Sequence, residues 1–384
     1  MRRLALALPW LLAGAGCPST PAKPVASATT VTTRDDEAGL ARLYAELQDD
    51  VLSSYERDEP LEVDTSAIDP KVGTARIGAG PGDVYVAGDA ARAVSRWPLD
   101  VDRFTRTEVR SKHLTIQIAA DQSAAWIADE LSWRIEMCGR IAVIPLRITV
   151  LYAHDGDRWV PVSEHLSYGF PPTPIDAAAP KPIKSAASSA ELDGALRAVV
   201  ERGLLATPHD PSLLAQDAGA LVLGPDAADE WHGASVITAP VPPGKLEDHR
   251  VGTVGRGGRD ATVAYWIGNY TADIAARPGY AAGKVGLRAT FVFEKRPFAT
   301  RGGQPPDAVA CARPQARDTG IECRWVLVQS QLSQPITDDD LTQQVFGTAL
   351  VSAKPLALDC GDGTATLGAG PRPAAVHPPA ARIR

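Results

Sequence analysis

The chain has 384 residues, of which 45% are hydrophobic, so its length allows two or three domains with cores of their own. Its formal net charge of -7 disfavours nucleic acid and anionic surfaces as partners. Beyond the N-terminus, no apolar run approaches the roughly 20 residues that span a bilayer. The sequence therefore predicts no integral membrane segment downstream of its start.

The N-terminus has the features of a secretory signal. A positively charged start precedes a short apolar run over 4–12 and the small residues Ala-Gly-Ala-Gly, so we expect 1–16 to be a signal peptide. Cys17 follows directly. This arrangement resembles the lipobox of bacterial lipoproteins, with Gly14 where that family usually has Leu, and the resemblance implies that Cys17 takes up lipid. The alternative is ordinary signal cleavage, which leaves Cys17 free or paired.

Two segments are predicted to be disordered. Residues 17–35 are rich in Pro, Ala, Ser and Thr and should form a tether, and residues 359–384 should form a tail. With lipid on Cys17, the tether would hold the folded part away from the membrane to which it is anchored in the bacterial cell envelope. Pro18 after the Cys favours the outer membrane, by resemblance to known sorting patterns.

The five cysteines suggest an oxidising compartment. If Cys17 carries lipid, an even set of four remains. Cys311 and Cys323 flank a polar connection with Pro and Gly, which predicts a disulfide between them. Cys138 and Cys360 would form a second, long-range bridge or remain two buried thiols. The spacing of Cys311 and Cys323 fits neither zinc nor CxxC redox patterns, and no cluster of His and Cys completes a metal site, so we predict no metal site and no cofactor.

The first half of the chain predicts an α+β domain over 36–170. Apolar residues at helical spacing mark a helix from about 36 to 57. Three long runs rich in Ile, Val, Thr and Trp follow between 124 and 167 and predict an antiparallel meander, with an Asp-Gly turn between the last two. The residues of the helical stripe are Leu40, Leu43, Tyr44, Leu47, Val51 and Tyr55.

The second half repeats this pattern. A Pro/Ala/Ser linker over 171–189 leads to a second domain over 190–358, which carries an insertion at 297–322. GALVLGPDAADEW parallels GDVYVAGDAARAV, and RWVLVQSQLS parallels RWVPVSEHLS. We interpret these blocks as a duplication in which Gln331 stands in place of His165.

Each copy resembles a SnoaL-like domain of the nuclear transport factor 2 superfamily. The resemblance implies two cone-shaped, curved antiparallel sheets, each wrapped on an N-terminal helix. The superfamily includes isomerases, cyclases, dehydratases, binding proteins and dimerisation modules, so the fold does not decide the function. The residues that carry the resemblance are Trp159, His165 and Ser167, then Ala125, Trp126 and Ile127, and finally Asp226, Trp231 and Gly233.

Asp129 is the first candidate for catalysis. Along 124–137 it is the single charge among the odd-numbered residues, which otherwise form an apolar face. In a cone, burial would raise the pKa of this carboxyl and suit it to act as a base. The alternatives are a place near a strand end, a pair with Arg147, or a reversed face with Glu130 inward. Gly268 aligns with Asp129 in the second copy.

His165 is the second candidate. It is predicted to share a strand face with Trp159 and Ser163, where a neutral imidazole would accept a proton or serve only as a structural group. Residues 255–260 (GRGGRD) are interpreted as a hairpin turn, because they lack the phosphate-loop pattern. Further residues expected to line or plug the two cones are Trp126, Trp133, Arg147, Tyr265, Trp266 and Tyr270.

We therefore predict an envelope-anchored lipoprotein with two SnoaL-like domains that binds a small molecule without catalysis or serves as a scaffold for other proteins. The alternative is an acid-base enzyme that acts on a small hydrophobic substrate in the first cone through Asp129 and His165. Expected partners are the membrane, through lipid on Cys17, and a small hydrophobic ligand or an envelope protein. Nucleic acid is not expected, and a dimer through sheet faces is a further possibility.

Overall fold

The computed structural model of the chain describes residues 34–56, 67–86, 106–137, 140–169, 179–226, 228–254, 261–275, 282–298, 307–312, 321–337 and 340–341. Within these ranges, no helix combines the length and apolar character needed to cross a membrane. Cys17, Cys138, Cys360 and residues 255–260 lie outside them.

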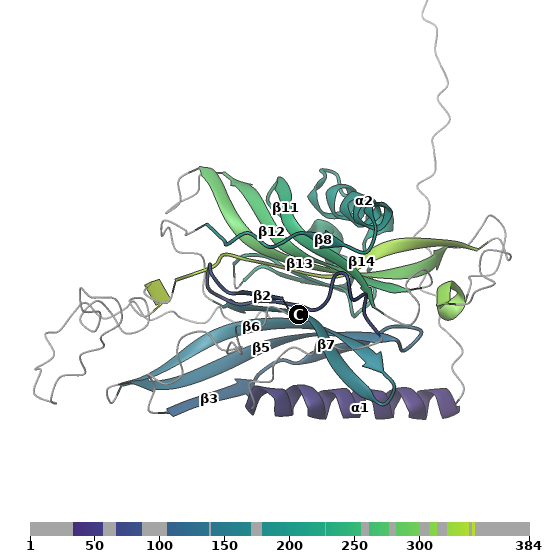
Figure 1. Cartoon of the computed structure of the whole chain (residues 1–384), viewed down its shortest axis with the longest axis horizontal. Helices are drawn as coiled ribbons and strands as arrows, with labels where there is room; N and C mark the ends of the chain where they lie inside the picture. Colours follow the sequence, from purple (N-terminus) through teal and green to yellow (C-terminus); the bar gives the residue numbers. More distant parts are fainter. Residues whose placement is uncertain are drawn as a thin grey trace, which may run out of the picture.

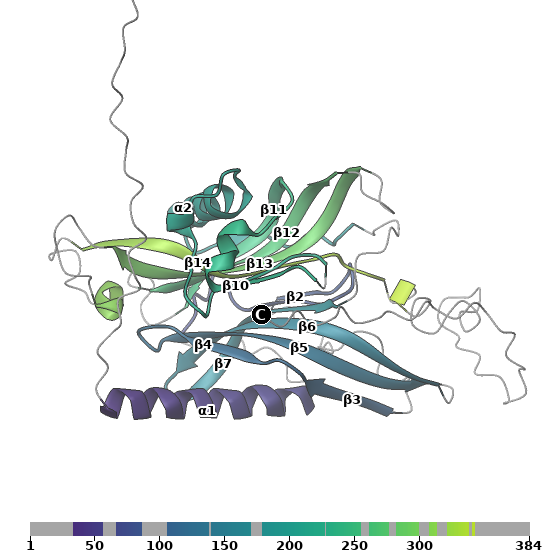
Figure 2. The same cartoon turned by 180° about the vertical axis from the view of Figure 1, so that it is seen from behind.

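Two sheets form the centre of the molecule, and each carries one helix on its outer side (Figures 1 and 2). Helix α1 (Arg34–Glu56) lies against the first sheet, and helix α2 (Ala190–Val199) lies against the second. The layers therefore run helix, sheet, sheet, helix. This arrangement is α+β, as predicted.

The first sheet has seven strands in the order β2-β1-β7-β6-β5-β3, and β4 also pairs with β5. The predicted meander is confirmed, because β5, β6 and β7 pair antiparallel in sequence. The strands are β1 (Ala75–Ile77), β2 (Val84–Val86), β3 (Arg106–Ser111), β4 (Thr115–Ile118), β5 (Ala124–Met137), β6 (Arg140–Asp155) and β7 (Arg158–Tyr168).

The second sheet also has seven strands, in the order β10-β9-β14-β13-β12-β11-β8. Short helices connect some of them: η2 (Val200–Leu205), η3 (Pro211–Leu213), η4 (Gly233–Thr238) and η6 (Ala308–Ala312). The strands are β8 (Ala186–Ala187), β9 (Leu221–Leu223), β10 (Glu230–His232), β11 (Gly244–Val254), β12 (Val263–Ile274), β13 (Gly283–Phe298) and β14 (Glu322–Ser333).

Helix α1 packs on the first sheet through an apolar stripe. Leu43, Leu47, Val51 and Tyr55 are buried, and their spacing of four residues keeps them on one face. Leu40 and Tyr44 were expected in the stripe, but they are exposed. The buried stripe is therefore narrower than predicted.

Five strands of the first sheet (β2-β1-β7-β6-β5) match five of the second (β10-β9-β14-β13-β12), whereas β3 and β4 both pair with β5 and β8 pairs with β11. Parallel pairing joins β1 to β7 and β9 to β14, and an antiparallel hairpin follows in each case. One bulge interrupts β7 opposite the step from Leu151 to Tyr152, and another interrupts β14 opposite the step from Val292 to Phe293. Counted from Arg147 and Arg288, these two steps occupy the same place.

The hairpin loops after β1 and β9 also match. Gly78 donates its N–H to the carbonyl of Asp83, and Gly224 donates to the carbonyl of Asp229, at 2.9 and 2.8 Å. A Cβ on either glycine would lie 2.6 Å from the Cβ of that aspartate. Since real Cβ atoms do not approach so closely, both loops require glycine at this position.

The inner faces of the two sheets share one core. Trp126 and Leu151 of the first sheet belong to the same buried cluster as Tyr265 and Val292 of the second. The segment after β14 returns to the first sheet, where Ile336 donates its N–H to the carbonyl of Ala79 at 3.0 Å. The two halves of the chain therefore contact each other through the segment after β14 as well as through the inner faces of their sheets.

The predicted bridge between Cys311 and Cys323 is confirmed. It joins η6, inside the insertion predicted at 297–322, to Cys323 at the start of β14. The linker predicted at 171–189 is partly ordered, because Ile183 is buried and Lys181 donates its N–H to the carbonyl of Pro81 at 2.8 Å.

Replacement of Leu47 by Ala should lower the free energy of unfolding by about 2–5 kcal/mol, because Leu47 is 0% exposed between α1 and the first sheet. Urea denaturation measures this change. The matched control is Gln48→Ala, because Gln48 is the next residue of the helix and its side chain is exposed. Equal stability of the two variants would contradict the packing of α1.

Candidate functional site

His165 lies in the interface between the two sheets. Val162 is an extra residue in β7 that has no partner on β6, and this bulge reverses the alternation of side chains between the two faces. His165 therefore pairs with Thr149 on the inner face. Its Nδ1 contacts Thr290 Oγ1 at 3.1 Å and its Nε2 contacts Ser333 Oγ at 2.7 Å, and both partners belong to the second sheet. The imidazole is 0% exposed. Hydroxyls both donate and accept, so a neutral ring is satisfied.

Gln331 makes the reciprocal contacts. It occupies on β14 the position that His165 occupies on β7, because it pairs with Thr290 as His165 pairs with Thr149. Thr149 donates its hydroxyl to Gln331 Oε1 at 2.7 Å, and Gln331 Nε2 donates to Ser167 Oγ at 2.9 Å. The two halves of the interface are therefore related by an approximate two-fold arrangement.

Two arginines extend this arrangement. Arg147 Nη1 donates to the carbonyls of Gly224 and Asp226, at 3.4 and 3.0 Å, in the hairpin loop after β9. Arg288 Nη2 donates to the carbonyl of Pro81, at 2.7 Å, in the hairpin loop after β1. Burial lowers the pKa of both arginines, that of Arg288 to about 10. Each arginine thus anchors the loop of the opposite half.

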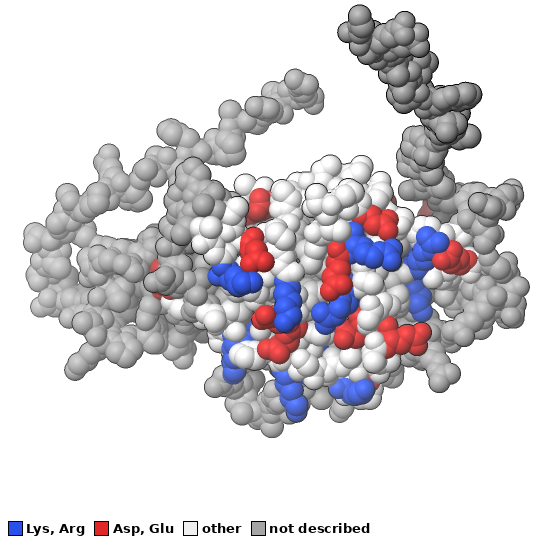
Figure 3. Space-filling model, turned by 90° about the horizontal axis from the view of Figure 1, so that it is seen from above, with Lys and Arg blue, Asp and Glu red and all other residues white. Residues whose placement is uncertain are grey.

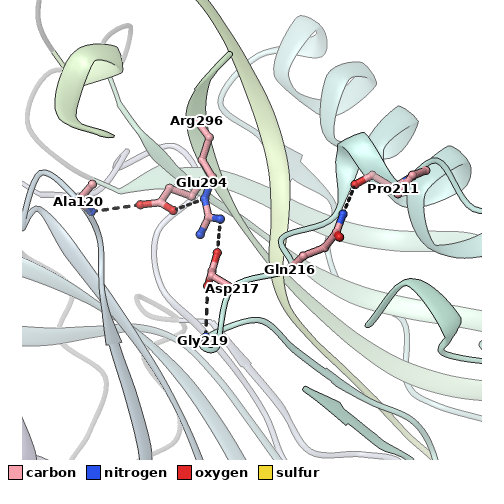
Figure 4. A network of polar contacts seen from close by, with 7 residues as sticks. All are labelled: Ala120, Pro211, Gln216, Asp217, Gly219, Glu294 and Arg296. Carbon is pink, nitrogen blue, oxygen red and sulfur yellow. Dashed lines mark hydrogen bonds and ion pairs between the residues drawn. The ribbon is translucent and has the colours of Figure 1, made fainter. Parts of the chain in front are cut away.

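A further polar network links the sheets at their edge (Figure 4). Glu294 of β13 accepts the N–H of Ala120, from the turn between β4 and β5, at 3.1 Å. Arg296 donates to Glu294 at 2.8 Å and also pairs with Asp217. Asp217 in turn accepts the N–H of Gly219 at 3.2 Å. Ionic and backbone groups therefore hold the turn of one sheet against the other.

The predicted face of His165 was wrong in part. Trp159 pairs with His154 on the helix side of the first sheet, whereas Ser163 and His165 lie on the inner face. The extra residue at the bulge changes the alternation of side chains between Trp159 and Ser163. A simple period of two could not predict this change.

Burial sets the electrostatics of His165. Desolvation, together with the positive charge of Arg288, lowers the pKa of His165 to about 3. The ring is therefore neutral near pH 7 and is held by two hydroxyls. Both ring nitrogens are engaged by hydroxyls of the second sheet, an arrangement that suits a structural group.

Asp129 lies on the helix side of β5, as predicted. Its Oδ2 accepts the hydroxyl of Tyr55 at 3.1 Å, and its Oδ1 accepts the N–H of His113 at 3.1 Å. Desolvation raises the pKa of Asp129, and hydrogen bonds from Ser111, His113 and Tyr55 oppose that rise. The carboxylate occupies the gap between β3 and β4, where the edge of the sheet is interrupted.

A small pocket touches both Asp129 and Arg147. It has room for about one water molecule, so a larger ligand requires movement. The alternative in which Asp129 pairs with Arg147 is not supported, because Arg147 lies on the opposite face and donates to backbone carbonyls. The lining residues are His113, Thr115, Ala128, Asp129, Glu130, Arg147, Leu221, Leu223 and Glu230.

Two of the aromatic candidates lie between the sheets, not in a cone. Trp126 pairs with Leu151 in the shared core, and Tyr265 donates its hydroxyl to the carbonyl of Gly73 at 2.6 Å. Burial raises the pKa of the Tyr265 hydroxyl. These two rings therefore pack in the interface between the sheets.

The other three aromatic candidates lie on the helix sides. Trp133 is 0% exposed in the core beneath α1. Trp266 follows Tyr265 and so points to the opposite face, where His249 stacks on it at 5.1 Å. Tyr270 shares that face and hydrogen-bonds the carbonyl of Pro242, and burial raises its pKa. These rings plug the cores rather than line an open cavity.

The structure also reveals an ion pair that sequence analysis missed. Arg76 Nε lies 2.9 Å from Glu164 Oε1, and the two side chains are 4% and 0% exposed. Both project to the helix side of the first sheet. The corresponding residues of the second sheet are Val222 and Ser330. The sequence showed only that one strand carries Arg76 and another carries Glu164, opposite charges on strands that prove to be neighbours.

One of three comparisons with known proteins, a family model, supports the fold of the first sheet. Residues 76–171 match the family model of the SnoaL-like domain. No curated protein is similar enough to match. A solved structure described as "Ntf2 like protein involved in plasmid conjugation" is similar to this chain, with 11% identity, coverage of 60% of this chain and 79% of that chain, and a TM-score of 0.17.

The match falls on residues 76–171, which comprise most of the first sheet, and it indicates a fold of the nuclear transport factor 2-like class for that part of the chain. More specifically, residues 76–171 contain a SnoaL-like domain. Among the described residues, no group of three or more His, Cys, Asp and Glu side chains is placed to hold a metal ion. The face shown in Figure 3 mixes Lys and Arg with Asp and Glu and has no patch of one sign.

Stability should depend on pH through His165. Its pKa falls from 6.5 to about 3 on folding, so between these values the unfolded chain binds a proton that the folded protein does not. The free energy of unfolding should therefore decrease as the pH drops from 6.5 towards 3, by about 1.4 kcal/mol per unit.

Urea denaturation between pH 4 and 7 tests this slope against the His165→Gln variant, which cannot titrate at that position. The difference between the two proteins isolates His165 from the carboxylates. Parallel stability curves would contradict a buried neutral imidazole. Gln is a conservative replacement, because Gln331 fills the equivalent place in the second sheet.

Proposed function

We propose that the protein is a non-catalytic envelope lipoprotein in which two duplicated SnoaL-like domains form one binding or scaffold unit. The supporting observation is that buried polar side chains form hydrogen bonds across the interface between the two sheets. His165, Gln331 and the two arginines bind the opposite half of the chain and are not presented to solvent. Because these side chains already bind the opposite half, they hold the two sheets together and are not placed to act as an acid and a base on a ligand.

The duplication is supported by shared strand order, shared bulge position and matching glycine loops. Gly268 pairs with Ala289 as Asp129 pairs with Ile148, so the second copy has no carboxylate at that position. We infer that the copies retain a common interface and differ on their helix sides. The inner faces already pack within one chain, so partners would bind the outer faces or the edges.

Anchoring through Cys17 remains part of the proposal and rests on the leader and the tether that follows. The protein would then be held at the bacterial envelope, in the outer membrane where two membranes exist. Its partners would be the membrane, through the lipid, and an envelope protein or small hydrophobic ligand.

Cys17→Ala should release the protein from membranes, because lipid attachment requires the thiol. Fractionation of cells that express the parent and the variant measures the membrane-bound share. Ser19→Ala, two residues further along, is the matched control and should fractionate like the parent. Retention of Cys17→Ala in the membrane would refute lipid anchoring.

The scaffold role is tested by chemical cross-linking in intact cells, followed by purification from the envelope. Parent and His165→Gln should recover the same envelope proteins, because His165 has no contact with a partner in this proposal. Loss of a substrate-processing activity in His165→Gln, with its stability unchanged, would refute the non-catalytic role.

A second candidate function is acid-base chemistry in the first domain. The observation that favours it is the raised pKa of Asp129 beside a small polar pocket. This reaction would need α1 or the strand β4 to move, because the present pocket admits only about one water molecule.

Asp129→Asn discriminates between the two functions. In the scaffold proposal it lowers the free energy of unfolding by about 1–3 kcal/mol, since the amide NH₂ faces the donor of either Tyr55 or His113, and it leaves ligand binding unchanged. Thermal shifts against a library of small apolar molecules measure both effects. Glu130→Gln, which lines the same pocket, is the control. Loss of a ligand shift only in Asp129→Asn would favour the enzyme.

A further inference from the structure

Each half of the protein has a polar link between its helix and an irregular part of its sheet. In the first half, Asp129 accepts the hydroxyl of Tyr55 from α1 and lies at the gap between β3 and β4. In the second half, β11 has a bulge between Leu246 and His249, and Gly268 lies opposite His249 in the position that aligns with Asp129. The imidazole of His249 forms the link there.

Two hydrogen-bond acceptors hold the ring of His249. Its Nε2 lies 2.9 Å from Asp193 Oδ1 in the first turn of α2, and its Nδ1 lies 2.5 Å from the carbonyl oxygen of Glu247. A carbonyl oxygen only accepts, and so does an ionised carboxylate, which the N-terminal end of a helix stabilises. Both contacts are hydrogen bonds only when both ring nitrogens donate, and this requires the doubly protonated, positively charged ring.

The packing around the ring also suits a positive charge. His249 stacks on Trp266 with ring centroids 5.1 Å apart and ring planes inclined by 16°. A cation over the face of a tryptophan is stabilised by the electrons of the indole. A Cβ on Gly268 would lie 2.6 Å from the Cβ of His249 and 2.6 Å from the carbonyl oxygen of Asp248, so the backbone of His249 needs glycine opposite it.

Asp193 is the charged group that contacts the ring. The side chains of His249 and Asp193 are 13% and 27% exposed, so both exchange protons with water. From the segment before β8, Ser185 accepts the backbone N–H of His249 at 3.2 Å and carries no charge. The other charged residues nearest in sequence to these contacts are Glu191 and Arg197 of α2, Lys184 before β8, and Glu247 and Asp248 of β11.

We propose that His249 is a proton-dependent clasp between α2 and β11. With its second proton, the ring links Asp193 of the helix to the bulge of the strand. Without that proton, one ring nitrogen presents a lone pair to an acceptor oxygen, and the ion pair with Asp193 is lost. Histidine changes its charge between about pH 5 and 8, so α2 is held less firmly on the second sheet as the pH rises through this range.

The clasp responds to pH in the opposite direction to His165. His165 contacts two hydroxyls and is neutral in the folded protein, so a proton added there weakens the interface between the sheets. His249 contacts two acceptors, so a proton added there strengthens the docking of α2. The clasp acts within one chain and needs neither lipid on Cys17 nor an envelope partner.

Hydrogen exchange at pH 6 and pH 8 tests the clasp in the full-length protein. The protection factors of the Leu196 and Val199 amides in α2, each divided by that of Phe291 in β13, should fall about fivefold from pH 6 to pH 8, because one hydrogen bond of the clasp is lost. The division removes changes in global stability. In His249→Gln the ratio should stay constant, because an amide does not titrate.

His232→Gln is the matched control. His232 forms a similar pair with Glu230 at 2.6 Å, but both residues belong to β10, so this pair does not join a helix to a sheet. The control should keep the response of the parent, whereas Asp193→Asn should reduce it. A constant ratio in the parent, a full response in His249→Gln or Asp193→Asn, or a lost response in His232→Gln would overturn the proposal.

Discussion

Satisfaction of buried polar groups between two sheets is the constraint on which this structure depends. His165 and Gln331 are 0% and 1% exposed, and each finds its side-chain partners only on the opposite sheet. An unsatisfied buried group of this kind costs about 1–3 kcal/mol. Separation of the sheets would leave several such groups unpaired at once, so the two halves behave as one folding unit.

The approximate two-fold arrangement explains why one position tolerates two residue types. Each site offers one threonine and one serine hydroxyl, and both groups can donate or accept. A neutral imidazole and an amide each supply a donor and an acceptor at similar reach. The difference between the two sheets at this position therefore concerns titration, because only histidine adds a proton at low pH.

Local features were predictable from the sequence because they depend on neighbouring residues. The helix at α1, the β5–β7 meander and the Cys311–Cys323 bridge follow from periodicity, turn residues and spacing. The faces of Trp126 and Tyr265 were not predictable in this way. The alternation of side chains along a strand shows which residues share a face, but it does not show whether a helix or a second sheet covers that face.

The same argument accounts for the missed ion pair. Arg76 and Glu164 are 88 residues apart in sequence, and only the parallel pairing of β1 with β7 places them opposite each other. A buried pair gains little net stability over apolar residues, and Val222 and Ser330 fill the equivalent positions without charges. The pair therefore marks the helix side of the first domain as chemically different from that of the second. The inner faces of the two sheets carry matching polar groups, whereas the buried helix sides differ in charge at this position.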